Sequence, residues 1–164
     1  MITALISTDG RLDPLAATLA ALVPGVAEGL VADAVVLSRG DDPAVAAVAD
    51  GVGAAHVRVG PSPAGWAAGA GVARRDWLFC LEAGDVPQDG WIGGVEAFLA
   101  GAAGPGLARA MRARLARPFL LWERLLGARD IRPGALVQRS LLAGQGLSRR
   151  VRPARLDARI RTRR

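Results

Sequence analysis

Two carboxylates stand three positions apart at the end of the apolar segment WLFCLEAGD, residues 77–85. The apolar run predicts a buried strand, so Glu82 and Asp85 would lie on the turn after its carboxyl end. Open parallel sheets bind ligands beyond the carboxyl ends of their strands, and hard divalent cations prefer carboxylate oxygens as ligands. The pair therefore predicts a metal or phosphate site. The alternative is a polar turn in which Asp85 bonds to its own loop.

The elements that would position these acids alternate regularly. Strands are predicted over 2–7, 33–38, 54–59 and 77–83, and helices over 12–23, 41–50, 65–73 and 88–100. The predicted N-caps are Asp13, Asp42 and Asp89. This alternation predicts an α/β fold, a single domain with a Rossmann-like, mostly parallel sheet and helices on both faces.

The first predicted strand ends in a second group of polar residues, Ser7, Thr8 and Asp9. In a parallel sheet this turn would reach the same edge as Glu82 and Asp85. The alternative is that the three residues only end the strand and turn the chain.

The composition fits one cytoplasmic domain. The chain has 164 residues, of which 51% are hydrophobic, enough for a single core but not for two. Cys80 is the one cysteine and lies in a predicted strand, so a reduced compartment is expected. No apolar stretch approaches the roughly 18 residues of a membrane span, and no charged leader precedes the first strand. His56 has no second ligand nearby, which favours a structural role.

Charge divides the chain into two parts. Residues 1–108 carry 5 Arg and 12 acidic residues, a net charge of −7, whereas residues 109–164 carry 16 Arg and 3 acidic residues, a net charge of +13. A basic part can meet phosphates, an acidic partner or the anionic inner face of a membrane, where the protein would be peripheral. Nucleic-acid binding is not predicted, because no aromatic residues are spaced among the Arg residues for stacking on bases.

The second half, 101–164, is expected to belong to the same domain as the first, 1–100. After the break at 101–106, an apolar stripe predicts two short helices or one helix kinked at Pro118. The stripe comprises Ala108, Met111, Leu115, Phe119, Trp122 and Leu126. It predicts core packing or a homodimer contact, with an interfacial membrane helix as the alternative. A strand is predicted over 133–140. The Arg-rich end is predicted to be a solvated, flexible tail, with a last strand over 154–160 as the alternative.

Residues 2–100 resemble the nucleotide-sugar half of the family 2 glycosyltransferases. LISTDG stands at the first turn of that family and VVLSRGDDP at its second. AAGAGVARRDWLFCLEAGDVPQDGW resembles the stretch from the family's Asn-x-Gly helix, through its metal motif, to Pro-x-x-Gly-Trp. The matching residues in this stretch are Gly69, Ala73, Asp76, Pro87, Gly90 and Trp91. The resemblance implies the fold of the nucleotide-diphospho-sugar transferases.

The same resemblance implies an activity, the transfer of a sugar from a nucleotide-diphospho-sugar to an acceptor. The nucleotide-binding residues that it implies are Ser7, Thr8, Asp9, Ser38 and Asp42. It also implies a Mn²⁺ or Mg²⁺ ion held by Glu82 and Asp85, which would neutralise the diphosphate as the glycosidic bond breaks.

Several positions depart from the family pattern. Gly84 stands where the metal motif has its second acid, and Asp85 follows one residue late. Ser38 lies where the family has acids at the end of the second strand. The family carries its catalytic base in a segment that here has no carboxylate between Asp130 and Asp157. One of these two residues would have to act as the base, so the catalytic residues are unassigned.

Two hypotheses remain open. The first is an active glycosyltransferase whose acceptor is lipid- or membrane-associated, in keeping with the basic second half. The second is a catalytically degenerate domain that keeps the sheet and acts as a binding, scaffold or dimerisation module. The missing second acid and base favour the second hypothesis, whereas the retained first turn and the acids of the fourth strand favour the first.

Overall fold

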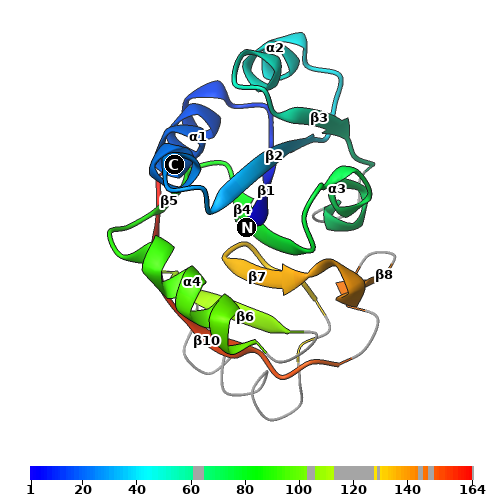
Figure 1. Cartoon of the computed structure of the whole chain (residues 1–164). Coiled ribbons are helices and arrows are strands. Elements are labelled where there is room, and N and C mark those ends of the chain that lie inside the picture. The colour runs from blue at the N-terminus through cyan, green and yellow to red at the C-terminus, as the bar shows by residue number, and fades with distance from the viewer. Residues whose placement is uncertain are drawn as a thin grey trace.

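Eight strands form one sheet in the order β3-β2-β1-β4-β7-β6-β10-β5 (Figure 1). The computed structural model describes residues 1–60, 65–102, 106–112, 128, 130–143, 146–147 and 150–163. The strands of this sheet are β1 Ile2–Thr8, β2 Val31–Ser38, β3 Ala55–Arg58, β4 Trp77–Glu82, β5 Asp85–Pro87, β6 Leu107–Arg112, β7 Ala135–Gln138 and β10 Ala154–Thr162. A 3₁₀ turn at Arg139–Leu141 leads to a separate pair, β8 Leu142–Ala143 and β9 Gly146–Leu147. Both halves of the chain contribute to the large sheet and so form one domain.

The four strands predicted in the first half are confirmed. β3, β2, β1 and β4 lie side by side and are parallel. β7 is antiparallel to both β4 and β6, and β10 is parallel to β6 and antiparallel to β5. The parallel half therefore has the predicted topology. The sheet is extended on the β4 side only, by β7, β6 and β10 of the second half and by β5 of the first.

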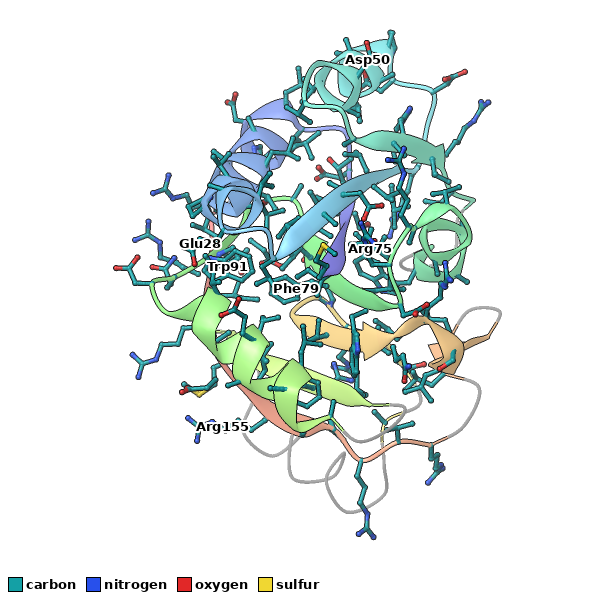
Figure 2. The ribbon with its side chains drawn as sticks, viewed as in Figure 1. Glu28, Asp50, Arg75, Phe79, Trp91 and Arg155 are labelled. Carbon is teal, nitrogen blue, oxygen red and sulfur yellow. The ribbon has the colours of Figure 1, made fainter. Side chains whose placement is uncertain are left out.

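Helices cover both faces of the sheet, as predicted (Figure 1). The helices α1 Leu12–Ala27, α2 Pro43–Gly51 and α4 Trp91–Gly101 pack on one face, and α3 Trp66–Val72 packs on the other. Alternate strand residues supply the two cores, with Ile6 and Phe79 in the first and Leu5 and Cys80 in the second. Phe79 also stacks on Trp91 of α4, with ring centroids 5.8 Å apart and an interplanar angle of 17° (Figure 2).

One of the three predicted helix caps is confirmed. Asp42 accepts a hydrogen bond from the backbone of α2 at 2.9 Å. The predicted cap at Asp13 is wrong because α1 begins at Leu12, which places Asp13 inside the first turn. The predicted cap at Asp89 is wrong because Gly90, with a φ of 83°, directly precedes α4. Glycine adopts this left-handed conformation without the steric penalty that a side chain brings.

The helix predicted from the apolar stripe is wrong at its beginning, where residues 107–112 form β6. Ala108 and Ala110 are buried in the first core and Leu107 in the second, which is the period of a strand. Pairing with β7 and β10 satisfies the backbone of this segment and overrides the helical spacing of the stripe. The rest of the stripe, Leu115, Phe119, Trp122 and Leu126, lies outside the described residues.

The Arg-rich end forms β10, the alternative to a solvated tail. Leu156, Ala158 and Ile160 are buried, and the residues between them are exposed. β10 lies inside the sheet, between β6 and β5. The basic residues of this segment are therefore fixed on a strand.

Cys80 gives the fold a specific response to alkaline pH. Its side chain is fully buried, and burial raises the pKa of the thiol far above its usual value of 9.0, an effect that the charge of Arg109 partly offsets. The unfolded chain loses this proton above that value, whereas the folded chain keeps it. The stabilisation is therefore complete below the unfolded pKa and is lost as the pH rises toward the folded pKa. The sequence contains neither Lys nor Tyr, so no other side chain has its ordinary pKa in this alkaline range.

We expect the free energy of unfolding, measured by urea denaturation, to fall above the usual thiol pKa by up to about 1.4 kcal/mol per pH unit. Cys80→Ala should be less stable at neutral pH because it leaves a cavity, but its stability should not change over the same alkaline range. Equal slopes for the two proteins would show that this thiol is not the titrating group.

Candidate functional site

The turns after β1 and β4 are neighbours at the carboxyl-end edge of the parallel strands. Ser7 pairs with Glu82 in the register of these strands, and the backbone N–H of Ala83 donates to Ser7 O at 2.8 Å. β2 ends beside them, with Ser38 opposite Thr8. The shared edge that the sequence predicts is therefore confirmed. We call residues 7–10, 38–42 and 82–85 the rim.

The β1 turn of the rim is closed by its own polar side chains. The backbone N–H of Gly10 donates to Thr8 Oγ1 at 3.1 Å, and that of Arg11 donates to Asp9 Oδ1 at 3.2 Å. Gly10 has a φ of 101°, which side-chain-bearing residues rarely adopt. Thr8 is buried and Asp9 is exposed, so Thr8 supports the turn while Asp9 lies on its surface.

Asp42 connects the β2 turn to the β1 turn. Its Oδ1 accepts the hydrogen bond that caps α2. Its Oδ2 lies 3.4 Å from the point that a Cβ on Gly10 would occupy. One carboxylate oxygen of the β2 turn is therefore directed at the backbone of the β1 turn.

Ser38 is held by His56, a contact that the sequence does not reveal. The Ser38 hydroxyl donates to Gly40 O at 2.8 Å, and His56 Nε2 lies 2.8 Å from the same hydroxyl oxygen. When the hydroxyl proton is donated to Gly40, the His56 tautomer protonated at Nε2 can donate to the same oxygen. The contact depends on the register of β2 and β3, which pairs Val36 with His56. Ser38 is only 2% exposed, so the contact with His56 fixes the end of β2 from inside the protein.

The structure separates the two acids of the β4 turn. Glu82 is exposed on the rim, whereas Asp85 is fully buried. Asp85 Oδ2 accepts a hydrogen bond from the backbone N–H of Glu82 at 3.0 Å, and Asp85 Oδ1 accepts one from the Thr162 hydroxyl at 3.0 Å. Both oxygens of Asp85 are thus used inside the protein, one by its own turn and one by the end of β10.

Gly84 is enclosed between α1 and the residue that follows β10. Its N–H is shared between Pro14 O and Thr18 Oγ1, each at 2.9 Å, and its carbonyl oxygen accepts from the backbone N–H of Arg163 at 2.7 Å. Its φ is 96°, and a Cβ at this position would overlap Arg163 O. The position at which the family pattern has its second acid therefore has no space for a side chain.

These contacts do not fit the divalent metal that the fold family implies at the β4 turn. A metal held by Glu82 and Asp85 would need an oxygen of Asp85 at the surface of the rim, whereas this carboxylate is fully buried and each of its oxygens accepts a hydrogen bond inside the protein. In the part of the chain that the structure describes, no three His, Cys, Asp or Glu side chains are grouped closely enough to hold a metal ion. The arrangement is that of a turn fixed by hydrogen bonds.

The two residues expected to replace the catalytic base lie on separate elements. Asp157 is exposed on β10, five residues before Thr162, a distance of about 17 Å along an extended strand. Asp130 is also exposed, and its backbone carbonyl accepts a hydrogen bond from Arg109 at 3.0 Å. The assignment of a base to either residue stays a prediction.

Solved structures share this arrangement of strands and helices, although no protein-family model and no curated protein matches the chain. Glucosyl-3-phosphoglycerate synthase from Mycobacterium tuberculosis, solved with Mn²⁺, UDP and glucosyl-3-phosphoglycerate, superposes with a TM-score of 0.64 at 17% identity, covering 87% of this chain and 58% of that one. A mycobacterial protein superposes with a TM-score of 0.66 at 20% sequence identity, covering 98% of this chain and 65% of that one. Residues 1–349 of TarS from S. aureus superpose with a TM-score of 0.64 at 11% sequence identity, covering 86% of this chain and 48% of that one.

The chain spans less than two thirds of the length of each of these proteins. At such identities, the likeness concerns the fold and not the chemistry. The chain thus has the α/β fold of the nucleotide-diphospho-sugar transferases.

Proposed function

We propose that this chain binds a nucleotide-diphospho-sugar at the rim and transfers its sugar to an acceptor. The observation that carries the proposal is the pairing of Ser7 with Glu82, which sets two polar turns side by side at the edge where open α/β sheets bind ligands. The structural neighbours that hold UDP or UDP-glucose support the choice of ligand.

In this proposal the turn from Ser7 to Asp9 carries the nucleoside. Asp42 Oδ2 accepts a hydrogen bond from a ribose hydroxyl or a base N–H, because Oδ1 already bonds to α2 while Oδ2 is directed at the neighbouring turn. Ser38 contributes as a hydrogen-bond acceptor. Its hydroxyl proton is donated to Gly40 O, which leaves the lone pairs of its oxygen to accept hydrogen bonds.

A second candidate is a binding module that takes up the nucleotide-sugar without transferring the sugar. The specific observation in its favour is the inward position of Asp85, together with the lack of space for a side chain at Gly84. Release of UDP from UDP-glucose, with water as the acceptor, distinguishes the two candidates. A transferase shows slow release, whereas a binding module shows binding without release.

Nucleotide binding should raise the stability of the protein. Saturating UDP, at about 100 times its dissociation constant, adds roughly 2.7 kcal/mol to the free energy of unfolding. In Asp42→Asn the cap of α2 is kept, because Asn caps as well as Asp does, but the carboxylate is lost. We therefore expect an unchanged melting temperature without ligand and a smaller shift with UDP, measured by thermal unfolding.

The control for this experiment is Asp50→Asn, an exposed acid in the last turn of α2, at the opposite end of the helix from Asp42 (Figure 2). It should leave the UDP shift unchanged. The absence of a shift for the unaltered protein with UDP, GDP and ADP would rule out the proposed ligand class.

The exposed face of β10 is our candidate for the predicted contact with an anionic membrane surface. Arg155, Arg159 and Arg161 are exposed on this strand, and Arg155 points away from the body of the protein (Figure 2). Met111, 46% exposed, pairs with Arg159 on the neighbouring strand. Basic side chains near an anionic bilayer each contribute on the order of 1 kcal/mol to binding. None of the helices in the described parts of the chain is long and apolar enough to cross a membrane.

Flotation with vesicles that contain phosphatidylglycerol tests this surface. Replacing Arg159 and Arg161 together by Gln should weaken binding roughly 25-fold, from about fivefold per charge, and high salt should abolish it. The matched control replaces Arg74 and Arg75, two exposed arginines beyond α3, by Gln. Equal losses in the two double variants would show that net charge and not this face is responsible.

A further inference from the structure

We infer that hydrogen bonds to the C-terminal strand hold the β4 turn in the place of a metal ion, and that the rim takes up its nucleotide without a divalent cation. The first part stands on the contacts of the turn alone, whereas the second rests on the proposed nucleotide binding. Both parts concern the residues 82–85 and their neighbours on α1 and β10.

The carboxylate of Asp85 is buried and closes the β4 turn. It bonds to the backbone N–H of Glu82 at one oxygen and to the Thr162 hydroxyl at the other, both at 3.0 Å. Hydrogen bonds to an ionised acceptor are the strong ones among protein hydrogen bonds. A metal ligand must instead present an oxygen toward the nucleotide, on the exposed side of the turn. Asp85 is thus committed to closing the turn onto β10.

Gly84 occupies a position of the β4 turn that has no space for a side chain. Its backbone bonds to α1 on one side and to Arg163 on the other, and a side chain here would overlap Arg163 O. The φ of 96° disfavours any side chain independently of the space. An acid at this position is therefore excluded by the fold, in addition to being absent from the sequence.

The charged side chains of the rim are also poorly arranged for a divalent cation. Glu82 is the one exposed carboxylate of the β4 turn, and a single carboxylate is a poor anchor for an ion that seeks six or more oxygens. The other acids of the rim have partners on their own turns: Asp9 and Asp42 accept backbone hydrogen bonds, and Asp41 pairs with Arg58. Within the described residues, no three such ligands are grouped closely enough to hold a metal ion. The negative charge of a diphosphate must then be met by cationic side chains. Arg39 lies within the rim and Arg11 directly follows it; both are exposed, and we assign this contact to them.

The direct test is calorimetric titration of UDP in EDTA and in MnCl₂, alongside titration of Mn²⁺ alone followed by the electron paramagnetic resonance signal of the free ion. We expect equal UDP affinity, within twofold, in the two buffers, and no protein-bound Mn²⁺ at millimolar concentration. A UDP affinity at least tenfold higher in MnCl₂ would overturn the second part of the inference, and loss of that gain in Asp85→Asn would overturn the first part as well.

The hydrogen-bonded turn has a test of its own that needs no nucleotide. Asp85→Asn and Thr162→Val should each lower the melting temperature by about 3–6 °C, because the first weakens the two hydrogen bonds of this carboxylate and the second removes one of them. The double variant should be no less stable than the worse of the two, since both changes break the same contact. Additive losses would show that the two side chains act independently and would overturn the first part.

Gly84→Ala tests the lack of space in the turn, and Gly93→Ala is its matched control. A Cβ on Gly93, in α4, would meet nothing within 4 Å, so this change should leave the melting temperature unchanged or raise it. Gly84→Ala should lower it by more than either single change above. A protein that binds no nucleotide in either buffer would refute the proposed ligand, and the Mn²⁺ titration and the melting temperatures would still decide between hydrogen bonds and metal.

Discussion

Parallel pairing of β1 with β4 brings Ser7 opposite Glu82, and the hydrogen bond from Ala83 N–H to Ser7 O continues this pairing past the end of the strand. Because side chains alternate along a strand, a shift of one residue would exchange the two faces and bury groups that now face solvent. Leu5 and Cys80 in one core and Ile6 and Phe79 in the other fix this register. The chemistry available at the rim is thus set by packing several residues away from it.

Much of the parallel half of this fold could be predicted from the sequence, because short apolar runs and proline-marked helix starts act locally. Asp42 followed by Pro43 is such a local signal, and it caps α2 as expected. Asp13 resembles it but lies one residue inside α1, since the helix extends to Leu12 without a side-chain cap. β6 was not predictable, because its conformation depends on partners far along the chain, β7 and β10.

The candidate site shows the same division between local and distant causes. The polar turn after β1 could be predicted because it follows directly from a strand end and a glycine at residue 10. The bond of Asp85 to its own turn was the alternative that the sequence offered, but its bond to Thr162 could not be predicted, because Thr162 lies 77 residues later. The contact between Ser38 and His56 depends on the register of two strands, which no local pattern specifies. Where the hydrogen-bonding partner of a side chain lies on a strand far along the chain, the residue type alone says little about its role.

The place of β10 in the sheet bears on how the chain reaches its folded state. β5 lies near the middle of the sequence, and its hydrogen-bonding partner is β10. Residues 85–87 therefore cannot pair until residues 160–162 have been synthesised. Contacts of such long sequence separation slow folding, because loop closure comes before the contacts that compensate for it. On the ribosome, the turn that closes the rim would therefore be among the last parts of this domain to become ordered.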